Sequence, residues 1–287
     1  MFQWAAVACG YILDPPEFFD FSRIKCIKHL LKPTEDHHRP DPLDELYEEV
    51  LKGYFRHQGA QRLFRSVMGQ LIAAFEPLSI RSLIALRQRA SIGDNSDPES
   101  VGRMLRRLSS LLSNVDSSAQ NLPIVPLHTS FRDFVTNKEK SGDFYVDLSH
   151  FHRRSAYSCL DLVLHDLKFN ICNLESSYLA NSDVQDLKSR IAEHIPPALL
   201  YACRYWDDHL KHLDFDTGLF DKLRAFFDKN FLFWLEVLSL TGNVRLALPA
   251  LSSLNVWLVS GQGVSVTVNS MRQATNSYDR TGFSSGT

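Results

Sequence analysis

The sequence predicts a mainly α-helical chain that includes a small two-stranded wing. Apolar residues recur at intervals of three and four along successive segments, as on the buried faces of amphipathic helices. Two of these segments open with an acid followed by a proline, Asp41-Pro42 and Asp97-Pro98, which suit an N-cap and a first helical position. From Ser149 onward we expect no strand before the far C-terminus.

Four helices are expected between Arg39 and Leu112. The second follows a break around Gly59 and stops before Pro77, because proline cannot continue a helix. The apolar positions that define the four stripes are Leu43, Leu46, Tyr47, Val50, Leu51 and Tyr54; Leu63, Phe64, Val67, Met68, Leu71, Ile72 and Phe75; Ile80, Leu83 and Ile84; and Val101, Met104, Leu105, Leu108, Leu111 and Leu112.

The wing is expected from two short segments rich in β-formers. Ile124 to His128 is typical of a strand, and Phe144 to Val146 is its expected partner. Between them, Ser130 with Asp133 three residues later resembles a capping box for a short helix. A compact helical set closed by this hairpin is the assembly that the pattern favours.

The second half of the chain is expected to be a helical arm. Apolar-periodic stretches of ordinary helix length are separated by loops such as Asn181-Ser182 and Pro196-Pro197. Paired antiparallel helices of this kind would stack into a solenoid-like layer, although no clean internal repeat is visible. The polar tail, residues 261–287, is expected to be flexible. The helices are expected near 150–168, 182–194, 197–212, 216–228 and 230–241.

Composition and charge exclude several classes of partner. The chain has 287 residues, 44% of them hydrophobic, which is enough apolar material for a packed core. Its formal net charge of −2 provides no basic excess for a phosphate backbone or an anionic membrane, so we expect neither nucleic acid nor membrane as partner. The longest apolar run, Leu246 to Val259, is too short to span a bilayer. With five scattered cysteines, a cytoplasmic location with free thiols is expected.

Six segments in a fixed order resemble one family. They are similar to the region downstream of the nucleotide-binding core in fungal NACHT-domain proteins, which are NLR-like signalling NTPases of the STAND class. The resemblance covers roughly residues 1–258, and it depends on the ordered series of segments. The segments are Phe2–Cys9, Pro42–Tyr47, Phe64–Gly69, Pro77–Ser79, Pro126–Phe134 and Phe169–Tyr178.

The resemblance implies a domain organisation and a role. It divides the chain into a C-terminal remnant of the NTPase core at 1–38, a winged-helix domain at 39–148, an α-helical arm at 149–260 and the tail at 261–287. The implied function is regulatory and non-catalytic: nucleotide exchange in the intact architecture would shift the winged helix and rearrange packed domains. The alternative is a stand-alone helical scaffold that binds another protein, with no nucleotide linkage.

The chain lacks the residues that NTP hydrolysis needs. No GxxxxGK[ST] phosphate loop occurs, and no apolar strand ends in paired acids that could hold magnesium. We therefore expect no enzyme activity and no cofactor. ADP or ATP would bind only if an upstream NTPase domain or a protein partner supplied a phosphate loop. The chain resembles a truncated family member, a gene-model fragment or a degenerate paralogue, and these three alternatives stay open.

His128 is the candidate nucleotide-sensing residue. In related NLR-type NTPases, a winged-helix histidine contacts the diphosphate of ADP, and the resemblance places His128 at that position. Thr129 stands where animal and plant members carry an acid, and Asp133 lies in the next turn. The alternative reading is that His128 ends a strand and hydrogen-bonds locally through its ring.

Other chemistry-bearing residues favour structural roles. The histidines His150, His152, His209 and His212, even with Asp207 and Asp208, do not have the spacing of a zinc site, so no metal is expected. Core thiols are expected for Cys159 and Cys172, and the aromatic residues between Tyr201 and Trp234 are more typical of a core than of a partner surface. Arg103, Arg106 and Arg107 are expected to form a solvated helix face.

Overall fold

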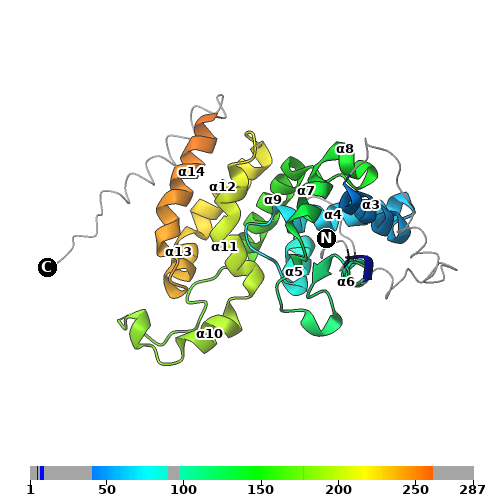
Figure 1. The fold of residues 1–287 in the computed structure, drawn as a ribbon. Helices are drawn as coiled ribbons and strands as arrows, with labels where there is room; N and C mark the ends of the chain where they lie inside the picture. Colours follow the sequence, from blue (N-terminus) through cyan, green and yellow to red (C-terminus); the bar gives the residue numbers. More distant parts are fainter. Residues whose placement is uncertain (1–4, 6, 10–40, 90–96, 177, 261–287) are drawn as a thin grey trace, which may run out of the picture. The chain divides into compact units, whose positions relative to one another are not determined.

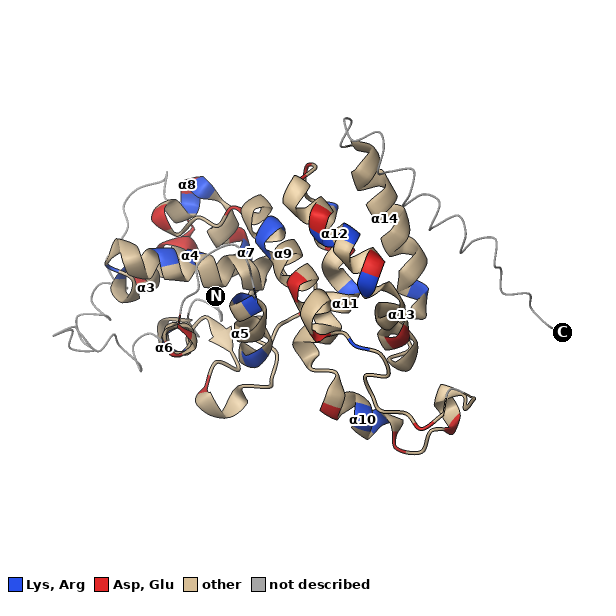
Figure 2. Ribbon diagram, turned by 180° about the vertical axis from the view of Figure 1, so that it is seen from behind, with Lys and Arg blue, Asp and Glu red and all other residues tan. Residues whose placement is uncertain are grey.

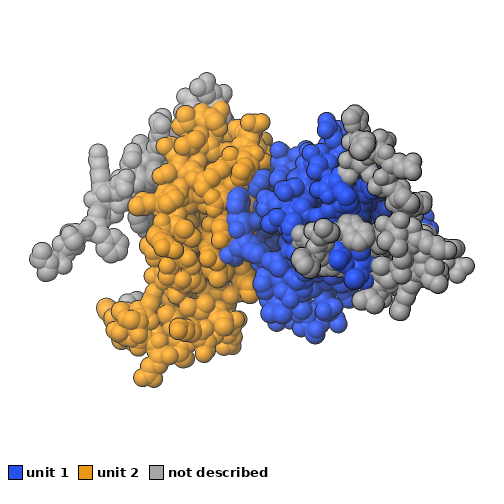
Figure 3. All heavy atoms as spheres, in the orientation of Figure 1, with its two compact units in different colours: residues 1–154 blue, residues 155–287 orange. Residues whose placement is uncertain are grey.

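The computed structural model describes residue 5 and residues 7–9, 41–89, 97–176 and 178–260, and it is mainly helical. The chain divides into two compact units, residues 1–154 and 155–287 (Figure 3). Apart from residues 5 and 7–9, the expected NTPase remnant at 1–38 lies outside the described residues, as does the expected tail at 261–287. The sequence-based limits of the four segments remain predictions.

Unit 1 contains a set of helices and a two-stranded antiparallel sheet (Figure 1). Helix α9, Leu148–Asp166, begins in this unit and ends in the next. The other elements are α3 (Pro42–Tyr54), α4 (Gln58–Ala73), α5 (Ile80–Arg89), α6 (Pro98–Arg106), β1 (Leu112–Ser113), η1 (Ser117–Ala119), β2 (Val125–Pro126), α7 (Thr129–Thr136), α8 (Lys138–Ser141) and η2 (Gly142–Phe144).

The two acid-proline starts are confirmed as helix caps. Asp41 Oδ1 accepts a hydrogen bond from the Leu43 backbone N–H at 2.9 Å, and Asp97 Oδ2 accepts one from the Ser100 N–H at 3.0 Å. Each cap satisfies a backbone donor that the first helical turn leaves without a partner. The expected break before the second helix lies at residues 55–57, and Gly59 itself belongs to α4, which begins at Gln58.

The wing prediction is wrong in its pairing. β2 pairs with β1 in the register Leu112↔Pro126 and Ser113↔Val125, and Leu112 had been assigned to a helix that in fact ends at Arg106. Of the expected partner strand, Phe144 to Val146, only Phe144 lies in a regular element, the 3-10 turn Gly142–Phe144, and Tyr145 and Val146 form no strand. Phe144 is buried beside Phe64, with the ring centroids 5.4 Å apart, so core packing uses the aromatic residue that had suggested a strand.

Aromatic side chains fill the core of unit 1. Phe55 lies beside Phe64 with ring centroids 5.0 Å apart, and Tyr47 contacts Phe131 and Phe134 at centroid distances of 5.2 and 5.5 Å. All five residues are buried. Burial of a large side chain contributes about 1.5–3 kcal/mol of hydrophobic stabilisation, so this cluster joins α3, α4 and α7 into one core.

Unit 2 contains helices joined by loops, and no strand, within its described part. Trp206, Trp234 and Phe226 form its centre, with the two indole rings 6.0 Å apart, and Trp234 Nε1 donates to the Cys203 carbonyl at 2.8 Å. The expected arm helices are confirmed within a few residues. They are η3 (Asn181–Asp183), α10 (Leu187–His194), α11 (Pro197–Leu210), α12 (Thr217–Lys229) and α13 (Phe231–Leu240), followed by η4 (Val244–Leu246) and α14 (Ala247–Ser260).

Helix α14 was not among the expected helices, because Pro249 interrupts its apolar run. Pro249 lies in the first turn, where the missing backbone N–H removes no helical hydrogen bond.

No helix in the described ranges has the length and apolar character needed to cross a bilayer. Acidic and basic residues are intermixed along the helices of each unit (Figure 2), in keeping with the small net charge.

Gly69 allows α4 and α9 to approach closely. A Cβ atom added at Gly69 would lie 2.1 Å from Phe151 Cε2, well inside van der Waals contact, and the Phe151 side chain is itself buried. The two helices therefore pack at a distance that only glycine permits at this position.

Substitution at Gly69 should destabilise unit 1. We expect Gly69→Ala to lower the free energy of unfolding by about 1–3 kcal/mol, because the added methyl group forces the Phe151 ring to move in a packed core. Gly59→Ala, on the same helix with no atom within 4 Å of the added Cβ, should leave stability unchanged or slightly raised. Denaturant unfolding of both variants measures the difference, and equal stabilities would contradict the close-approach argument.

Candidate functional site

His128 caps helix α7. Its backbone is extended, with φ −149° and ψ 148°, and its Nδ1 accepts a hydrogen bond from the Ser130 backbone N–H at 3.0 Å. The expected capping box is therefore wrong: the helix begins at Thr129, and the cap is the histidine rather than Ser130. β2 ends at Pro126, so His128 does not end a strand.

A chain of hydrogen bonds fixes the His128 ring. Ser130 Oγ lies 2.6 Å from His128 Nδ1, and the Tyr47 hydroxyl lies 2.9 Å from the same Oγ. Because Nδ1 accepts from a backbone N–H, the neutral ring carries its proton on Nε2. The hydrogen bonds therefore all point in one direction: the Tyr47 hydroxyl donates to Ser130 Oγ, and Ser130 Oγ donates to His128 Nδ1. No described residue hydrogen-bonds to Nε2.

Burial keeps Tyr47 in the donating form. Burial raises the pKa of the Tyr47 phenol, and the hydrogen bond with Ser130 opposes this rise only in part. The neighbouring carboxylate of Asp44 raises it further, and Asp44 itself pairs with Lys140, with Oδ2 and Nζ 2.8 Å apart. Tyr47 therefore remains protonated, as the direction of the hydrogen-bond chain requires.

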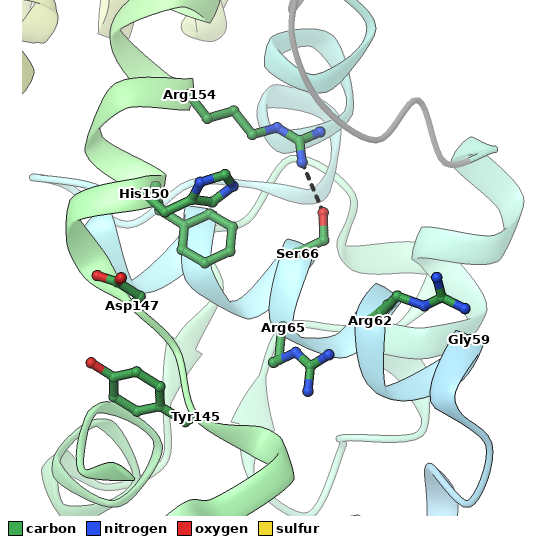
Figure 4. Close-up of a pocket in the computed structure, with 9 residues that line it drawn as sticks. Gly59, Arg62, Arg65, Ser66, Tyr145, Asp147, His150 and Arg154 are labelled. Atoms are coloured by element: carbon green, nitrogen blue, oxygen red, sulfur yellow. Dashed lines mark hydrogen bonds between the residues drawn. The ribbon is translucent and has the colours of Figure 1, made fainter.

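A basic groove lies in unit 1 between the first half of α4 and the start of α9 (Figure 4). It has a volume of about 790 Å³, and His128 is not among its lining residues. Arg62 and Arg65 extend from α4 on one side, and Tyr145 and His150 lie on the other. The full lining is Gly59, Arg62, Arg65, Ser66, Tyr145, Asp147, His150, Phe151 and Arg154.

Ser66 forms the polar centre of the groove. Its Oγ accepts from Arg154 Nη1 at 2.9 Å and from Arg87 Nη2 at 3.1 Å. Arg87 also donates to the Ser66 carbonyl and to Gln70 Oε1, and both arginines are nearly fully buried. Two guanidinium groups thus lie around one hydroxyl oxygen, and this arrangement raises the positive potential at the groove.

Asp147, the carboxylate that lines the groove, caps the helix that follows it. Asp147 Oδ1 accepts from the Ser149 backbone N–H at 3.1 Å, so it acts as the cap of α9. Arg65 Nη1 donates to the uncharged Asp143 carbonyl. Neither Arg62 nor Arg65 forms an ion pair within the described part of the chain. Positive charge therefore exceeds negative charge in this groove.

The structure places the four candidate metal histidines in separate environments. His150 lines the groove, and the buried His152 packs against Phe75 with ring centroids 5.6 Å apart. His209 is buried and lies 2.9 Å from the Tyr201 hydroxyl through Nε2, whereas His212 is exposed. Among the residues that the structure describes, no three His, Cys, Asp or Glu side chains gather as a metal site.

The candidate thiols have core positions, and so does part of the aromatic stretch. Tyr201, Trp206, Phe226 and Trp234 are buried, whereas Tyr205, Phe227, Phe231 and Phe233 are half-buried. Cys159 and Cys203 are buried in unit 2, and burial raises the pKa of each thiol, which disfavours the thiolate needed for nucleophilic attack. Burial likewise raises the pKa of the Cys172 thiol. Arg103 is exposed on α6 and pairs with Glu99 at 3.5 Å, as expected for a solvated face. Arg106 and Arg107 are exposed as well.

Sequence reasoning missed the groove arginines. Arg62 and Arg65 lie one turn apart on α4, which is a common pattern on exposed helices. Arg154 is about ninety positions away in the sequence, and only the packing of α9 on α4 brings it to Ser66. The charge spacing within α4 was the available signal, and it does not by itself indicate a groove.

Loss of the His128 cap should destabilise α7. We expect His128→Ala to lower the free energy of unfolding by about 0.5–2 kcal/mol, because the Ser130 N–H loses its acceptor. His128→Asn should retain most of the stability, since its side-chain oxygen can accept the same hydrogen bond. Thermal melting of both variants tests this, and an Asn variant no more stable than the Ala variant would contradict a capping role.

Asp207 should make stability depend on pH. Burial, followed by the neighbouring Asp208, raises the pKa of the Asp207 carboxyl, while Lys211 at 3.4 Å opposes the rise. The folded state therefore binds this proton more tightly than the unfolded chain does. The contribution of Asp207 to stability falls as pH rises from the ordinary carboxyl pKa, about 3.9, through the raised value.

Asp207→Asn should therefore gain stability relative to the unmodified chain at pH 7, and the gain should shrink near pH 4. Denaturant unfolding at the two pH values measures it. Asp221→Asn, at an exposed position on α12, is the control and should show no such pH-dependent gain. A pH-independent effect of Asp207→Asn would show that the altered proton affinity is not the cause.

The sequence is similar to vegetative incompatibility protein HET-E-1 of Podospora anserina. The two are 24% identical over 266 residues, covering 83% of this chain and 18% of HET-E-1, so the chain spans less than one fifth of that relative's length. No protein-family model matches the chain, and no solved structure matches it. At this level of identity the similarity is distant, and it is in keeping with the expected NACHT-like resemblance.

Proposed function

We propose that this chain is a non-catalytic regulatory portion of a NACHT-type signalling protein and acts in the cytoplasm. Its helical fold and its distant similarity to HET-E-1 support a regulatory role. In this proposal, residues 39–148 act as the winged-helix domain and residues 149–260 as the helical arm. A nucleotide held by a separate phosphate-loop domain is the signal that moves them.

The orientation of His128 carries the proposal. Its Nδ1 is used to cap α7, and the hydrogen bonds through Ser130 and Tyr47 hold the ring in place. The Nε2–H donor is therefore fixed in direction, and no described residue accepts from it. A fixed donor of this kind suits a phosphate oxygen, because no ring reorganisation is needed when the anion arrives.

Catalysis is assigned elsewhere in this proposal. The sequence contains no phosphate loop, whose backbone amides and lysine would hold the β- and γ-phosphates. The chain would contribute one phosphate contact through His128, while an upstream NTPase domain or a partner protein supplies the others. Binding of ADP would then favour one of two packed arrangements by its differential affinity for them.

A second candidate function is a protein-binding scaffold without nucleotide linkage. Helices α13 and α14 carry apolar residues that face solvent: Leu232, Leu248 and Val256 have exposed fractions of 61%, 70% and 69%. Exposed apolar surface is typical of interaction sites when it is contiguous. This candidate needs no role for His128, so substitution of that residue separates the two functions.

The test compares His128→Ala and His128→Asn in a protein that joins this chain to a phosphate-loop domain. Asn keeps the helix cap but lacks the Nε2–H donor. Loss of a charge-assisted contact of about 1.5–3 kcal/mol should weaken ADP binding about tenfold or more in both variants. Calorimetric titration with ADP gives the affinities.

The control is the chain of residues 1–287 itself, which should bind ADP weakly at most and release no phosphate from ATP above background. ADP affinity that is unchanged in a folded His128→Asn variant would remove His128 from nucleotide sensing. That outcome would favour the scaffold function.

A further inference from the structure

The basic groove between α4 and α9 has the chemistry of an anion site. Three arginines and one histidine line it, against one carboxylate, Asp147, which is already engaged with the Ser149 N–H. Arg62 is exposed and makes no hydrogen bond or ion pair with a described residue. Guanidinium groups bind phosphate oxygens in a planar, bidentate geometry, which lysine cannot reproduce.

The groove is built by core packing. The Gly69 and Phe151 contact fixes the distance between α4 and α9. The bond from Arg154 to Ser66 Oγ joins the same two helices (Figure 4). Arg154 is 3% exposed, so its guanidinium is held by the core beneath the groove. A cation that is held in this way loses little conformational entropy when a ligand binds.

The size and lining of the groove indicate the kind of ligand. A volume of about 790 Å³ is within the range of small-molecule sites. Arg62 and Arg65 lie one helical turn apart, and Arg154 lies on the other helix, so the cations come from two elements, and a diphosphate can interact with more of them than a single phosphate can. Tyr145 and Phe151 add aromatic surface that can contact an organic ring.

We propose that this groove binds a small molecule that carries a diphosphate or a longer polyphosphate, with Arg62 and Arg65 as its phosphate ligands and Arg154 as a buried positive charge beneath them. The site does not include His128 and does not depend on the function proposed above. A single phosphate would engage only part of the cationic surface, and a long polyanion would extend past it.

The probe is inorganic pyrophosphate, titrated calorimetrically into the chain of residues 1–287 at low ionic strength. We expect saturable binding at one site, tighter than the binding of orthophosphate, and weakened by added salt. The double variant Arg62→Gln with Arg65→Gln should weaken pyrophosphate binding by at least about tenfold, because two charge-assisted contacts are lost. Arg224→Gln, which removes one exposed arginine from α12, should leave the affinity unchanged.

Two further variants distinguish loss of the site from loss of folding and from loss of nucleotide sensing. Arg62→Gln alone changes an exposed side chain that has no hydrogen bond or ion pair with a described residue, so this variant should fold as the unmodified chain does. It should already weaken pyrophosphate binding. His128→Asn should have no effect, which distinguishes failure of this site from failure of nucleotide sensing. The proposal is overturned if pyrophosphate does not bind saturably, if both arginine variants bind it normally, or if a peptide with one phosphoserine displaces pyrophosphate more strongly than tripolyphosphate does.

Discussion

The contact between Gly69 and the Phe151 ring sets the distance between α4 and α9, and the basic groove depends on that distance. Ser66 lies one turn before Gly69 on α4, and its partner Arg154 lies one turn after Phe151 on α9. A side chain larger than hydrogen at position 69 would separate the helices and move Arg154 away from Ser66. A core packing constraint therefore determines the position of a charged surface feature.

Sequence patterns within single segments predicted the helices well, but they did not predict which distant segments pair or pack together. The Asp41 and Asp97 caps and the arm helices follow from patterns that span only a few residues, where the physical cause is contained in the same segment. The wing failed because short apolar segments fit either a strand or a core turn. Phe144 lies in the core beside Phe64, and Leu112 leaves its helical stripe to pair with Pro126. Neither outcome is determined by neighbouring residues alone.

The candidate sites show the same division. His128 was selected through a family resemblance, yet its cap of α7 and its contact with Ser130 are local and within reach of sequence reasoning. The contact of Ser130 with the Tyr47 hydroxyl could not be predicted in this way, because the two residues are eighty-three positions apart in the sequence. The groove arginines were missed because Arg154 meets Ser66 only through the packing of two helices that are distant in sequence.

Histidine is an unusual N-cap residue, and this supports a function for His128 beyond capping α7. Asn, Asp, Ser and Thr are the preferred caps, so capping alone would favour one of them over an imidazole. Imidazole differs from these residues by having a second nitrogen on the opposite side of the ring, and the cap leaves that nitrogen protonated and directed away from the helix. A residue that is not the preferred cap and adds no stability is expected where the position has a function, and His128 fits this description.

Overall charge and local charge lead to different conclusions in this chain. A net charge of −2 argues against a long basic stripe for nucleic acid, but charges more than a Debye length apart, about 8 Å at physiological ionic strength, hardly influence one another at the surface. The potential in the groove is therefore determined mainly by the charged side chains that line it, which are Arg62, Arg65, Arg154, His150 and the capping residue Asp147. Such a confined positive region can neutralise a compact anion, whereas a continuous phosphate backbone would extend beyond it, past helices that carry acidic as well as basic residues (Figure 2).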